Sequence, residues 1–351
     1  MMARPYSRVD SSPKEIKDSG HRAIYSVAFS PDGKHLLSGG RNGIRQWQVS
    51  NGQEVWRSAE SEDVYAIALS RDHKWIVSGS TEGATVWDAK SHDKVHHWQV
   101  DGAYVHTVDI SPDSTKFATG TSLGQKNARS VNVWDIITGE RLVGPLGHDG
   151  SVVGVRFSPK GHYIATFTQK HHIRVFDISN GHQLIEFDNK MPEWSALTPI
   201  VWPSDAPSQL FAMSEGGKIK SFDTSTGSQL AEWQIHDDSS LMSIALPANN
   251  KFIASSAGHS VSFWDTTTHT QVGSVLKDVD KIRSVALSPD GTHLATGGYN
   301  TTITIWNLRG ILPESYLSIT VSATFPIFWR PVYEPTFSHA CKPIFSLLSR
   351  V

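Results

Sequence analysis

Cysteine is almost missing from this chain of 351 residues. The single residue, Cys341, excludes a disulfide framework and any zinc cluster built on cysteines. Net charge is also nearly missing, because 32 Lys and Arg stand against 34 Asp and Glu, which gives −2. A chain with so little net charge has no general attraction for nucleic acid or for a membrane surface. We therefore expect neither of them as a partner.

Long apolar runs and targeting segments are equally scarce. No uncharged apolar stretch reaches the roughly 18 residues that a membrane helix needs. The chain does not open with a basic and then apolar signal segment either. We expect a soluble intracellular protein, cytoplasmic or nuclear, that has no membrane span.

Two familiar site motifs are absent as well. No glycine-rich loop ends in Gly-Lys-Ser or Gly-Lys-Thr, and no His-Glu-x-x-His occurs. The doublets His96-His97 and His171-His172 suggest metal binding, but adjacent residues on a strand point to opposite faces. Neither doublet can then give two ligands to one ion. We expect no enzymatic activity, no metal and no cofactor.

What the chain does contain is a repeat of 40 to 47 residues, which two markers follow in phase. One marker is a Ser-Pro-Asp-Gly type of turn, as in Ser30-Pro31-Asp32-Gly33 and Ser288-Pro289-Asp290-Gly291. The other is a recurrent aromatic residue at Trp47, Trp87, Trp134, Phe176, Phe222, Trp264 and Trp306. Five of these aromatics are followed by an aspartate, and we interpret those aspartates as turn formers rather than as a catalytic ring.

Each unit reads as four short strands. A strand of alternating small and large residues precedes the turn, as in Ser26-Val27-Ala28-Phe29, and a third strand ends at the marker aromatic. Hairpin corners such as Asn51-Gly52 separate the third strand from the fourth. One such sheet cannot bury both of its faces, so the units must stack on each other. Radial stacking also protects the sheet edges.

These residues resemble the WD-repeat β-propellers, over about residues 13–310. The Trp-Asp ends, the Ser-Pro-Asp-Gly turns and the pairs Gly20-His21 and Gly147-His148 carry the resemblance. It implies an all-β fold with seven four-stranded antiparallel blades that binds other proteins and rarely performs chemistry. The chain looks similar to fungal WD-repeat proteins in particular. The fifth unit is the poorest, since Val201-Trp202-Pro203-Ser204-Asp205 replaces the usual turn.

In well-formed family members a histidine, a serine or threonine on strand two, an aspartate and the tryptophan form a buried hydrogen-bond network. Here the Gly-His pair occurs twice, with His236 as a third candidate, and Asn300 replaces the aspartate in unit seven. A partial polar network stabilises less than a complete one. We therefore expect blade cores that are held mainly by apolar packing.

The resemblance divides the chain into an N-terminal extension (1–12), a propeller (13–310) and an irregular C-terminal tail rich in proline and aromatic residues (311–351). Two segments compete to close the ring. Lys14 to Lys17 lie where family members place the closing strand, and Tyr316 to Ile319 could instead complete blade seven in sequence. The spacing favours the N-terminal segment. The tail is read either as an apolar docking segment or as an extension without a role of its own.

Candidate binding residues come from the resemblance, because one face of such a ring carries the loops that precede strand one. The residue five positions before each turn opens strand one at that face: Tyr25, Tyr65, His106, Val153, Thr198, Met242 and Arg283. Trp194, Lys126 and Arg129 lie in long loops of the same face. Tyr, Met and Arg are enriched in protein interfaces. We expect a scaffold, monomeric or part of a larger complex, that binds a peptide or a protein loop here.

Two other functions stay open. Propellers that act as substrate receptors of cullin ubiquitin ligases often end a repeat in Trp-Asp-x-Arg/Lys, which Trp87-Asp88-Ala89-Lys90 matches and Trp306-Asn307-Leu308-Arg309 approaches. The acids that usually accompany this motif are missing from the chain. A propeller hydrolase would need acids at the central channel, and none of the seven face positions is acidic.

Overall fold

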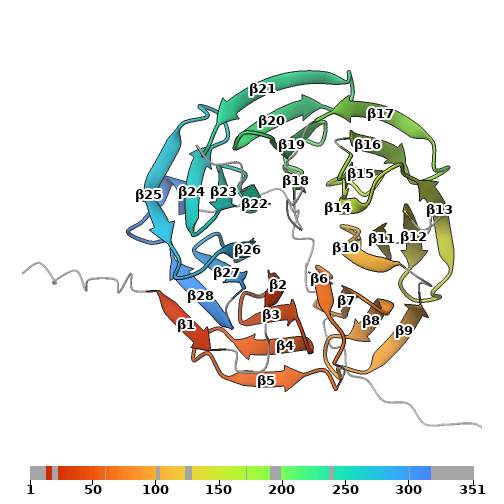
Figure 1. Ribbon diagram of the computed structural model, residues 1–351, viewed down its shortest axis with the longest axis horizontal. Coiled ribbons are helices and arrows are strands. Elements are labelled where there is room, and N and C mark those ends of the chain that lie inside the picture. The colour runs from red at the N-terminus through yellow and green to blue at the C-terminus, as the bar shows by residue number, and fades with distance from the viewer. Residues whose placement is uncertain are drawn as a thin grey trace, which may run out of the picture. The chain divides into compact units, whose positions relative to one another are not determined.

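Seven four-stranded antiparallel sheets build the computed structural model of this chain. The structure describes residues 13–17, 23–59, 61–99, 103–122, 129–170, 172–189, 199–236, 241–299 and 301–317. Within these residues, six sheets hold four consecutive strands each, and the seventh joins strands from both ends of the propeller. The prediction of an all-β, seven-bladed propeller is therefore confirmed (Figure 1).

The strands of the first four blades are consecutive in the chain. Blade 1 contains β2 (Ile24–Phe29), β3 (His35–Gly40), β4 (Gly43–Gln48) and β5 (Glu54–Arg57). Blade 2 contains β6 (Val64–Leu69), β7 (Trp75–Ser80), β8 (Gly83–Asp88) and β9 (Lys94–Gln99). Blade 3 contains β10 (Tyr104–Ile110), β11 (Lys116–Ser122), β12 (Ser130–Asp135) and β13 (Arg141–Gly147). Blade 4 contains β14 (Val152–Phe157), β15 (Tyr163–Thr168), β16 (His172–Asp177) and β17 (Gln183–Asp188).

The remaining blades complete the ring. Blade 5 contains β18 (Ile200–Val201), β19 (Gln209–Ser214), β20 (Lys218–Asp223) and β21 (Ser228–Gln234). Blade 6 contains β22 (Leu241–Ala245), β23 (Phe252–Ala257), β24 (Ser260–Asp265) and β25 (Gln271–Lys277). Blade 7 contains β26 (Ile282–Leu287), β27 (His293–Gly298) and β28 (Thr302–Asn307), and β1 (Lys14–Lys17) is its fourth strand. A short helix, α1 (Glu314–Leu317), follows.

The first strand of each blade lies at the centre of the ring and the fourth at its rim (Figure 1). The middle strands are nearly all buried, because they pack against blades on both sides. In one cluster Leu36 and Trp47 of blade 1 pack with Ile303 of blade 7. Burial of apolar surface between adjacent sheets thus supplies the core that a single sheet lacks.

The Ser-Pro-Asp-Gly turns explain how strand one joins strand two. Ser30 Oγ donates to Asp32 Oδ1 at 2.6 Å and accepts from the amide of His35 at 2.9 Å, while Gly33 takes a φ of 69°. Serine and aspartate therefore satisfy the local backbone, and glycine supplies the left-handed conformation. The bond from Ser30 is also the main reason why the pKa of Asp32 lies below its usual range.

The aspartates after the marker aromatics are turn formers, as we interpreted them. Asp88 Oδ1 accepts from the amides of Lys90 and Ser91, at 2.9 and 2.8 Å. Asp265 Oδ1 accepts in the same way from the amides of Thr267 and Thr268. Such bonds satisfy the backbone of the hairpin corner between the third and fourth strands.

The hydrogen-bond network of the blades is partial, as expected. The indole Nε1 of the marker tryptophan donates to a strand-two hydroxyl in four blades, as Trp47 does to Ser38 at 2.9 Å. His148 Nε2 lies 2.9 Å from Thr166 Oγ1, and His236 Nε2 lies 3.2 Å from Ser255 Oγ. Blade 4 has a phenylalanine at the marker position, and in blade 6 Trp264 Nε1 has no partner, so among the described residues no blade joins histidine, hydroxyl and tryptophan in one network. His21 and Asn300 lie outside the described residues.

The N-terminal segment closes the ring, as the spacing favours. Strand β1 pairs antiparallel with β28, with Lys14 opposite Ile305 and Lys17 opposite Thr302. Ile16 is 3% exposed and packs in the core between blades 7 and 1. In the competing segment, Tyr316 and Leu317 lie in α1 and not in a strand, and Tyr316 donates to Asp265 Oδ2 at 2.6 Å. Ser318 and Ile319 lie outside the described residues.

Residues 311–317, which the sequence reading assigned to the tail, dock on blade 6. Leu312 and Leu317 are 3% and 4% exposed and belong to a cluster with Phe252 and Phe263. Lys251 Nζ donates to the carbonyl of Ser315 at 2.6 Å. These residues cover the apolar end of blade 6. The rest of the tail, from residue 318, lies outside the described residues.

Leu312→Ala should therefore lower the free energy of unfolding by about 2 kcal/mol, the usual value for one buried leucine. The loss cannot grow much larger, since this segment follows the last strand of the ring and can detach without opening it. Urea unfolding followed by tryptophan fluorescence measures it. The control is Leu230→Ala, at a residue that is 54% exposed, which should change stability by less than about 0.5 kcal/mol. Equal effects of the two substitutions would mean that Leu312 is not part of the core.

Candidate protein-binding face

The expected face residues occupy one structural position in six blades. The pairing of strands one and two skips a residue near the start of strand one, for example between Ile24 and Ser26 and between Val105 and Thr107. The skipped residues are Tyr25, Tyr65, His106, Val153, Met242 and Arg283. Such a bulge re-aims its side chain out of the ladder. We call the end of the ring where the inner strands begin the mouth face.

Four blades carry a continuous chain of stacked side chains at this position. The rings of Tyr25 and Tyr65 lie 5.3 Å apart at an angle of 22°, and Tyr65 stacks on His106 at 4.4 Å. The Arg283 guanidinium lies 4.6 Å from the centre of the Tyr25 ring. The same guanidinium also lies 5.1 Å from the centre of the Tyr299 ring.

We call this chain the mouth arc and define it by six residues. Tyr104 ends it in blade 3, with its ring 6.0 Å from that of Tyr65. In order from blade 7 through blades 1 and 2 to blade 3, its members are Tyr299, Arg283, Tyr25, Tyr65, His106 and Tyr104.

Exposure differs strongly along the arc. Tyr25 is only 6% exposed, because neighbouring arc residues and Arg41 cover it, whereas Tyr299 is 49% exposed. Tyr25 thus forms the floor of the arc, and a partner would meet Tyr299, Arg283 and Tyr65 first. Replacing Tyr25 would disturb this packing as well as any binding.

Burial keeps the phenol and the imidazole of the arc uncharged. Burial, and then the Asp63 carboxylate, raise the pKa of Tyr65 to about 12. Burial, and then the Arg283 guanidinium, lower the pKa of His106 to about 4. At neutral pH the arc therefore offers neutral aromatic rings around a single positive charge.

A second guanidinium lies above the arc. Arg41 Nε donates to Tyr25 Oη at 3.1 Å and lies 3.7 Å from Asp63 Oδ2. Arg283 Nη1 makes the corresponding contact to Tyr299 Oη at 3.4 Å. Blades 1 and 7 thus each contribute one tyrosine and one arginine. In blade 1 the tyrosine lies on strand one and the arginine in the loop after strand two, and in blade 7 the two residue types are exchanged.

Sequence reasoning missed Tyr299, Tyr104 and Arg41. A signal exists for two of them, since Arg41 follows Gly39-Gly40 and Tyr299 follows Gly297-Gly298 at equivalent places in the repeat. A glycine pair at the end of strand two marks the residue that faces the strand-one bulge. Tyr104, at the start of β10, has no counterpart of this kind.

The other expected binding residues are not part of the arc. Arg129 Nη1 donates to the carbonyl of Asp149 at 3.2 Å, and among the described residues no contact joins it with the arc. Met242 lies in β22, and its side chain is outside what the structure describes. Lys126, Trp194 and Thr198 lie outside the described residues.

The histidine doublet in β9 does not converge on one point, as expected. His96 Nε2 lies 2.8 Å from the carbonyl of Ile137 in blade 3, and His97 Nδ1 lies 2.9 Å from Thr85 Oγ1 in its own blade. In the second doublet, His171 lies outside the described residues. Across the described ranges no three His, Cys, Asp or Glu side chains gather as a metal site would need.

Residues 120–124 read Gly-Thr-Ser-Leu-Gly, which has the Gly-x-Ser-x-Gly spelling of a hydrolase nucleophile motif. That motif needs a sharp turn from a strand into a helix, which exposes the serine. Ser122 is the last residue of strand β11 and is only 1% exposed, and the residues that follow it lie outside the described ones. Its surroundings are those of a core residue.

The two residues of the cullin-receptor reading lie at the opposite end of the blades. Lys90 follows Asp88 in the corner between β8 and β9, and Arg309 follows β28. Arg309 Nη1 lies 3.9 Å from Glu314 Oε2 in α1, with half of its side chain exposed. Neither residue touches the mouth arc in the described part of the chain.

No helix in the described ranges combines the length and the apolar character that crossing a bilayer requires.

Comparison with curated proteins finds relatives whose names describe them as subunits. The chain is 26% identical to target of rapamycin complex subunit wat1 of Schizosaccharomyces pombe, over 58% of this chain and 64% of that protein. It is 28% identical to eukaryotic translation initiation factor 3 subunit I of Aspergillus terreus, over 55% of this chain and 59% of that protein. It is 26% identical to transcription initiation factor TFIID subunit 5 of Caenorhabditis elegans, over 64% of this chain and 34% of that protein. The chain thus spans less than two thirds of each relative.

The family model described as WD domain, G-beta repeat, matches residues 14–48, 53–88, 140–177, 227–265 and 269–307. Each match begins at the fourth strand of one blade and ends with the third strand of the next. The boundaries of the sequence repeat are therefore shifted by one strand from those of the blade. The unmatched stretches include the first three strands of blade 3 and the first three strands of blade 5, the poorest repeat in sequence. Since the matches cover more than half of the residues, the chain belongs to the WD40 family.

Proposed function

We propose that this protein is a non-catalytic interaction scaffold whose mouth arc binds a peptide or a loop of a partner protein. The observation that carries the proposal is Arg283, whose guanidinium lies against the rings of both Tyr25 and Tyr299. Stacking fixes the guanidinium before a partner arrives, so little side-chain entropy is left to lose on binding. Arg283 Nε is buried and has no hydrogen-bond partner among the described residues, so any hydrogen bond to a partner would come from the Nη atoms.

The make-up of the arc supports a protein partner. Tyrosine and arginine dominate interface hot spots, where they combine apolar area with hydrogen bonding. All arc residues except Tyr299 are held on the inner strands of blades 7, 1, 2 and 3, and rigid strands position a binding group better than loops do. The relatives named above are subunits of complexes, which is the setting a scaffold needs. The intracellular location expected from the sequence stays a prediction.

The test compares the proteins captured from cell extract by the wild-type chain and by two arc variants, Arg283→Ala and Tyr299→Ala. If the arc is the hot spot, each variant should retain at least tenfold less of the captured partner, because truncating a hot-spot residue costs about 2 kcal/mol. Both variants should keep the wild-type unfolding midpoint within a few degrees, since Tyr299 is half exposed.

The matched control is Tyr163→Ala. Tyr163 is 38% exposed and begins β15, beside the turn that follows strand one of blade 4, so it lies away from the mouth face. The control should retain the partner fully. Equal retention by all three variants, or an equal loss in the control, would reject the mouth arc as the binding site.

A further inference from the structure

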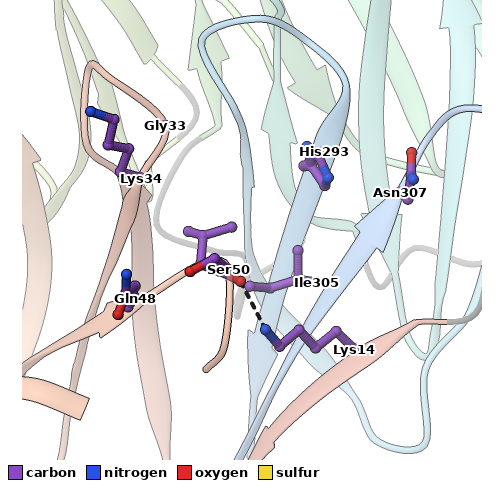
Figure 2. Close-up of a pocket in the computed structure, with 9 residues that line it drawn as sticks. Lys14, Gly33, Lys34, Gln48, Ser50, His293, Ile305 and Asn307 are labelled. Carbon is purple, nitrogen blue, oxygen red and sulfur yellow. Dashed lines mark hydrogen bonds between the residues drawn. The ribbon is translucent and has the colours of Figure 1, made fainter. Parts of the chain in front are cut away.

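A cleft of about 550 Å³ lies where the ring closes, between blade 1 and blade 7 (Figure 2). It opens on the side of the Ser-Pro-Asp-Gly turns, opposite the mouth face. Figure 2 shows Lys34 and Gln48 of blade 1 on one side and Ile305 and Asn307 of blade 7 on the other. The volume lies within the range of pockets that bind ligands.

The lining of the cleft carries positive charge and no negative charge. Lys14 and Lys34 supply this charge, and no acidic side chain lines the cleft. His293 also lines it, but burial lowers the pKa of its imidazole, which favours the neutral form. Lys14 Nζ donates to the carbonyl of Val49 at 2.9 Å, which holds its amine at the cleft wall (Figure 2). Lys34 is exposed, and its amine makes no hydrogen bond or ion pair with a described residue.

Two amide side chains add donors to this wall. Gln48 Oε1 already accepts from Asn51 Nδ2 at 3.1 Å, and Asn307 Oδ1 already accepts from the amide of Arg309 at 3.0 Å. The NH₂ groups of Gln48 and Asn307 therefore remain for a ligand. They lie on opposite sides of the cleft, one on each blade.

Apolar side chains complete the lining. Val49 is half-buried beside Lys14, and Ile305, 4% exposed, pairs with Lys14 across the β1–β28 ladder. A ligand that fits must therefore present negative charge, hydrogen-bond acceptors and some apolar surface together. An extended peptide with Asp or Glu next to an apolar residue has all three.

We propose that this cleft binds an acidic segment of a partner protein, with a carboxylate side chain between Lys14 and Lys34 and main-chain carbonyls on the NH₂ groups of Gln48 and Asn307. A phosphopeptide fits less well, because the lining has no arginine, whose planar fork matches phosphate oxygens. The site is separate from the mouth arc, so it holds or fails independently of the proposed function.

Binding here would couple to closure of the ring. Lys14 belongs to β1, the four-residue strand that joins the N-terminal segment to blade 7, whereas Lys34 and Gln48 belong to blade 1. A segment that contacts all of these residues connects the first blade with the last. Since a ligand that binds only the closed ring stabilises that ring, hydrogen exchange of the β1 amides should slow when the site is occupied.

In the test, a displayed library of random heptapeptides is selected for binding to the wild-type chain. Peptides that also bind the Lys34→Glu variant are then removed. Enriched sequences should carry Asp or Glu beside an apolar residue. A synthetic labelled copy of the leading peptide should bind at least tenfold more weakly to Lys34→Glu and to Asn307→Asp by fluorescence anisotropy. It should also slow exchange at β1.

Two control variants test the interpretation. Lys74 stands in the equivalent turn of blade 2, 3.5 Å from Asp72, so Lys74→Glu should leave the affinity unchanged. Arg283→Ala should also leave it unchanged, which separates the cleft from the mouth arc. An enriched set without acidic residues, no enrichment at all, or tighter binding of a phosphoserine copy of the same peptide would each overturn the proposal.

Discussion

Gly40→Ala should destabilise the ring by about 3 kcal/mol or more. A methyl group placed on Gly40 would lie 2.0 Å from the carbonyl oxygen of Ala23, and 3.1 and 3.3 Å from other backbone atoms of that segment. The neighbour is backbone and not a flexible side chain, so no rotamer change relieves the overlap. Overpacking of a well-filled site costs about 1–3 kcal/mol, and a clash with fixed backbone lies at the upper end or beyond.

The clash would also reach the mouth. The Ala23 carbonyl accepts from the amide of Arg41, and Tyr25 lies two residues further along the displaced strand. Gly40→Ala should therefore loosen the stacking of Tyr25 and Tyr65 together with the fold. Thermal unfolding by circular dichroism measures the stability, and near-ultraviolet dichroism reports the tyrosine packing.

Gly147→Ala is the matched control, because Gly147 also ends a strand but a methyl group there meets nothing within 4 Å. This variant should match the wild type or gain slightly, since alanine restricts the unfolded chain more than glycine does. A wild-type midpoint for Gly40→Ala would show that β2 can shift at no cost.

The fold could be predicted from the sequence because its signals are local and repeated. A serine, an aspartate and a glycine fix the turns of blades 1 and 7, and the tryptophan that follows donates to a hydroxyl on strand two. Blade 5 forms without these signals. There β18 is only two residues long, and Trp202 Nε1 donates to the carbonyl of Pro207 at 2.7 Å, which forms a different turn. Packing against both neighbouring blades keeps this poor repeat in the ring.

The candidate site could be predicted only in part, because it arises between blades. Counting back from each turn finds Tyr25 and Arg283 one at a time. It cannot show that Arg283 of blade 7 lies on the ring of Tyr25 in blade 1, since 258 residues separate them in the chain. It also cannot show that Tyr25 is buried. The cleft between blades 1 and 7 was not found from the sequence for the same reason, because its lysines come from strand β1 and from a turn of blade 1, which meet only on closure.

Acidification should cost the ring about 3 kcal/mol through one histidine, His148. Burial, the largest cause, lowers its pKa to about 4, from 6.5 in the unfolded chain. The Arg174 guanidinium acts in the same direction, whereas the Leu146 carbonyl, Asp149 and Glu186 act against it. Between pH 6.5 and pH 4 the unfolded chain binds a proton that the folded chain does not. Stability is therefore complete above pH 6.5 and is lost as the pH falls through 4, at about 1.4 kcal/mol per pKa unit.

The hydrogen bonds of His148 show why the neutral form is preferred. Nδ1 donates to the Leu146 carbonyl at 2.8 Å, so the neutral ring leaves Nε2 to accept from Thr166 Oγ1 at 2.9 Å. A proton on Nε2 would force that hydroxyl to turn toward the Arg174 carbonyl, at 3.3 Å. The charged ring would then stand in a site where only 8% of its surface is exposed.

His148→Gln isolates this contribution from those of other acid-sensitive groups. At pH 7 the variant should be less stable than the wild type, because the buried ring and its bonds are lost. The difference in unfolding free energy between the two proteins should shrink by about 3 kcal/mol at pH 4, because only the wild type is then destabilised by protonation of the buried His148. Urea unfolding at half-unit pH steps gives both curves, and the His148 ring resonance should titrate in NMR near pH 4. Parallel stability curves, or a ring that titrates near 6.5, would contradict the buried neutral histidine.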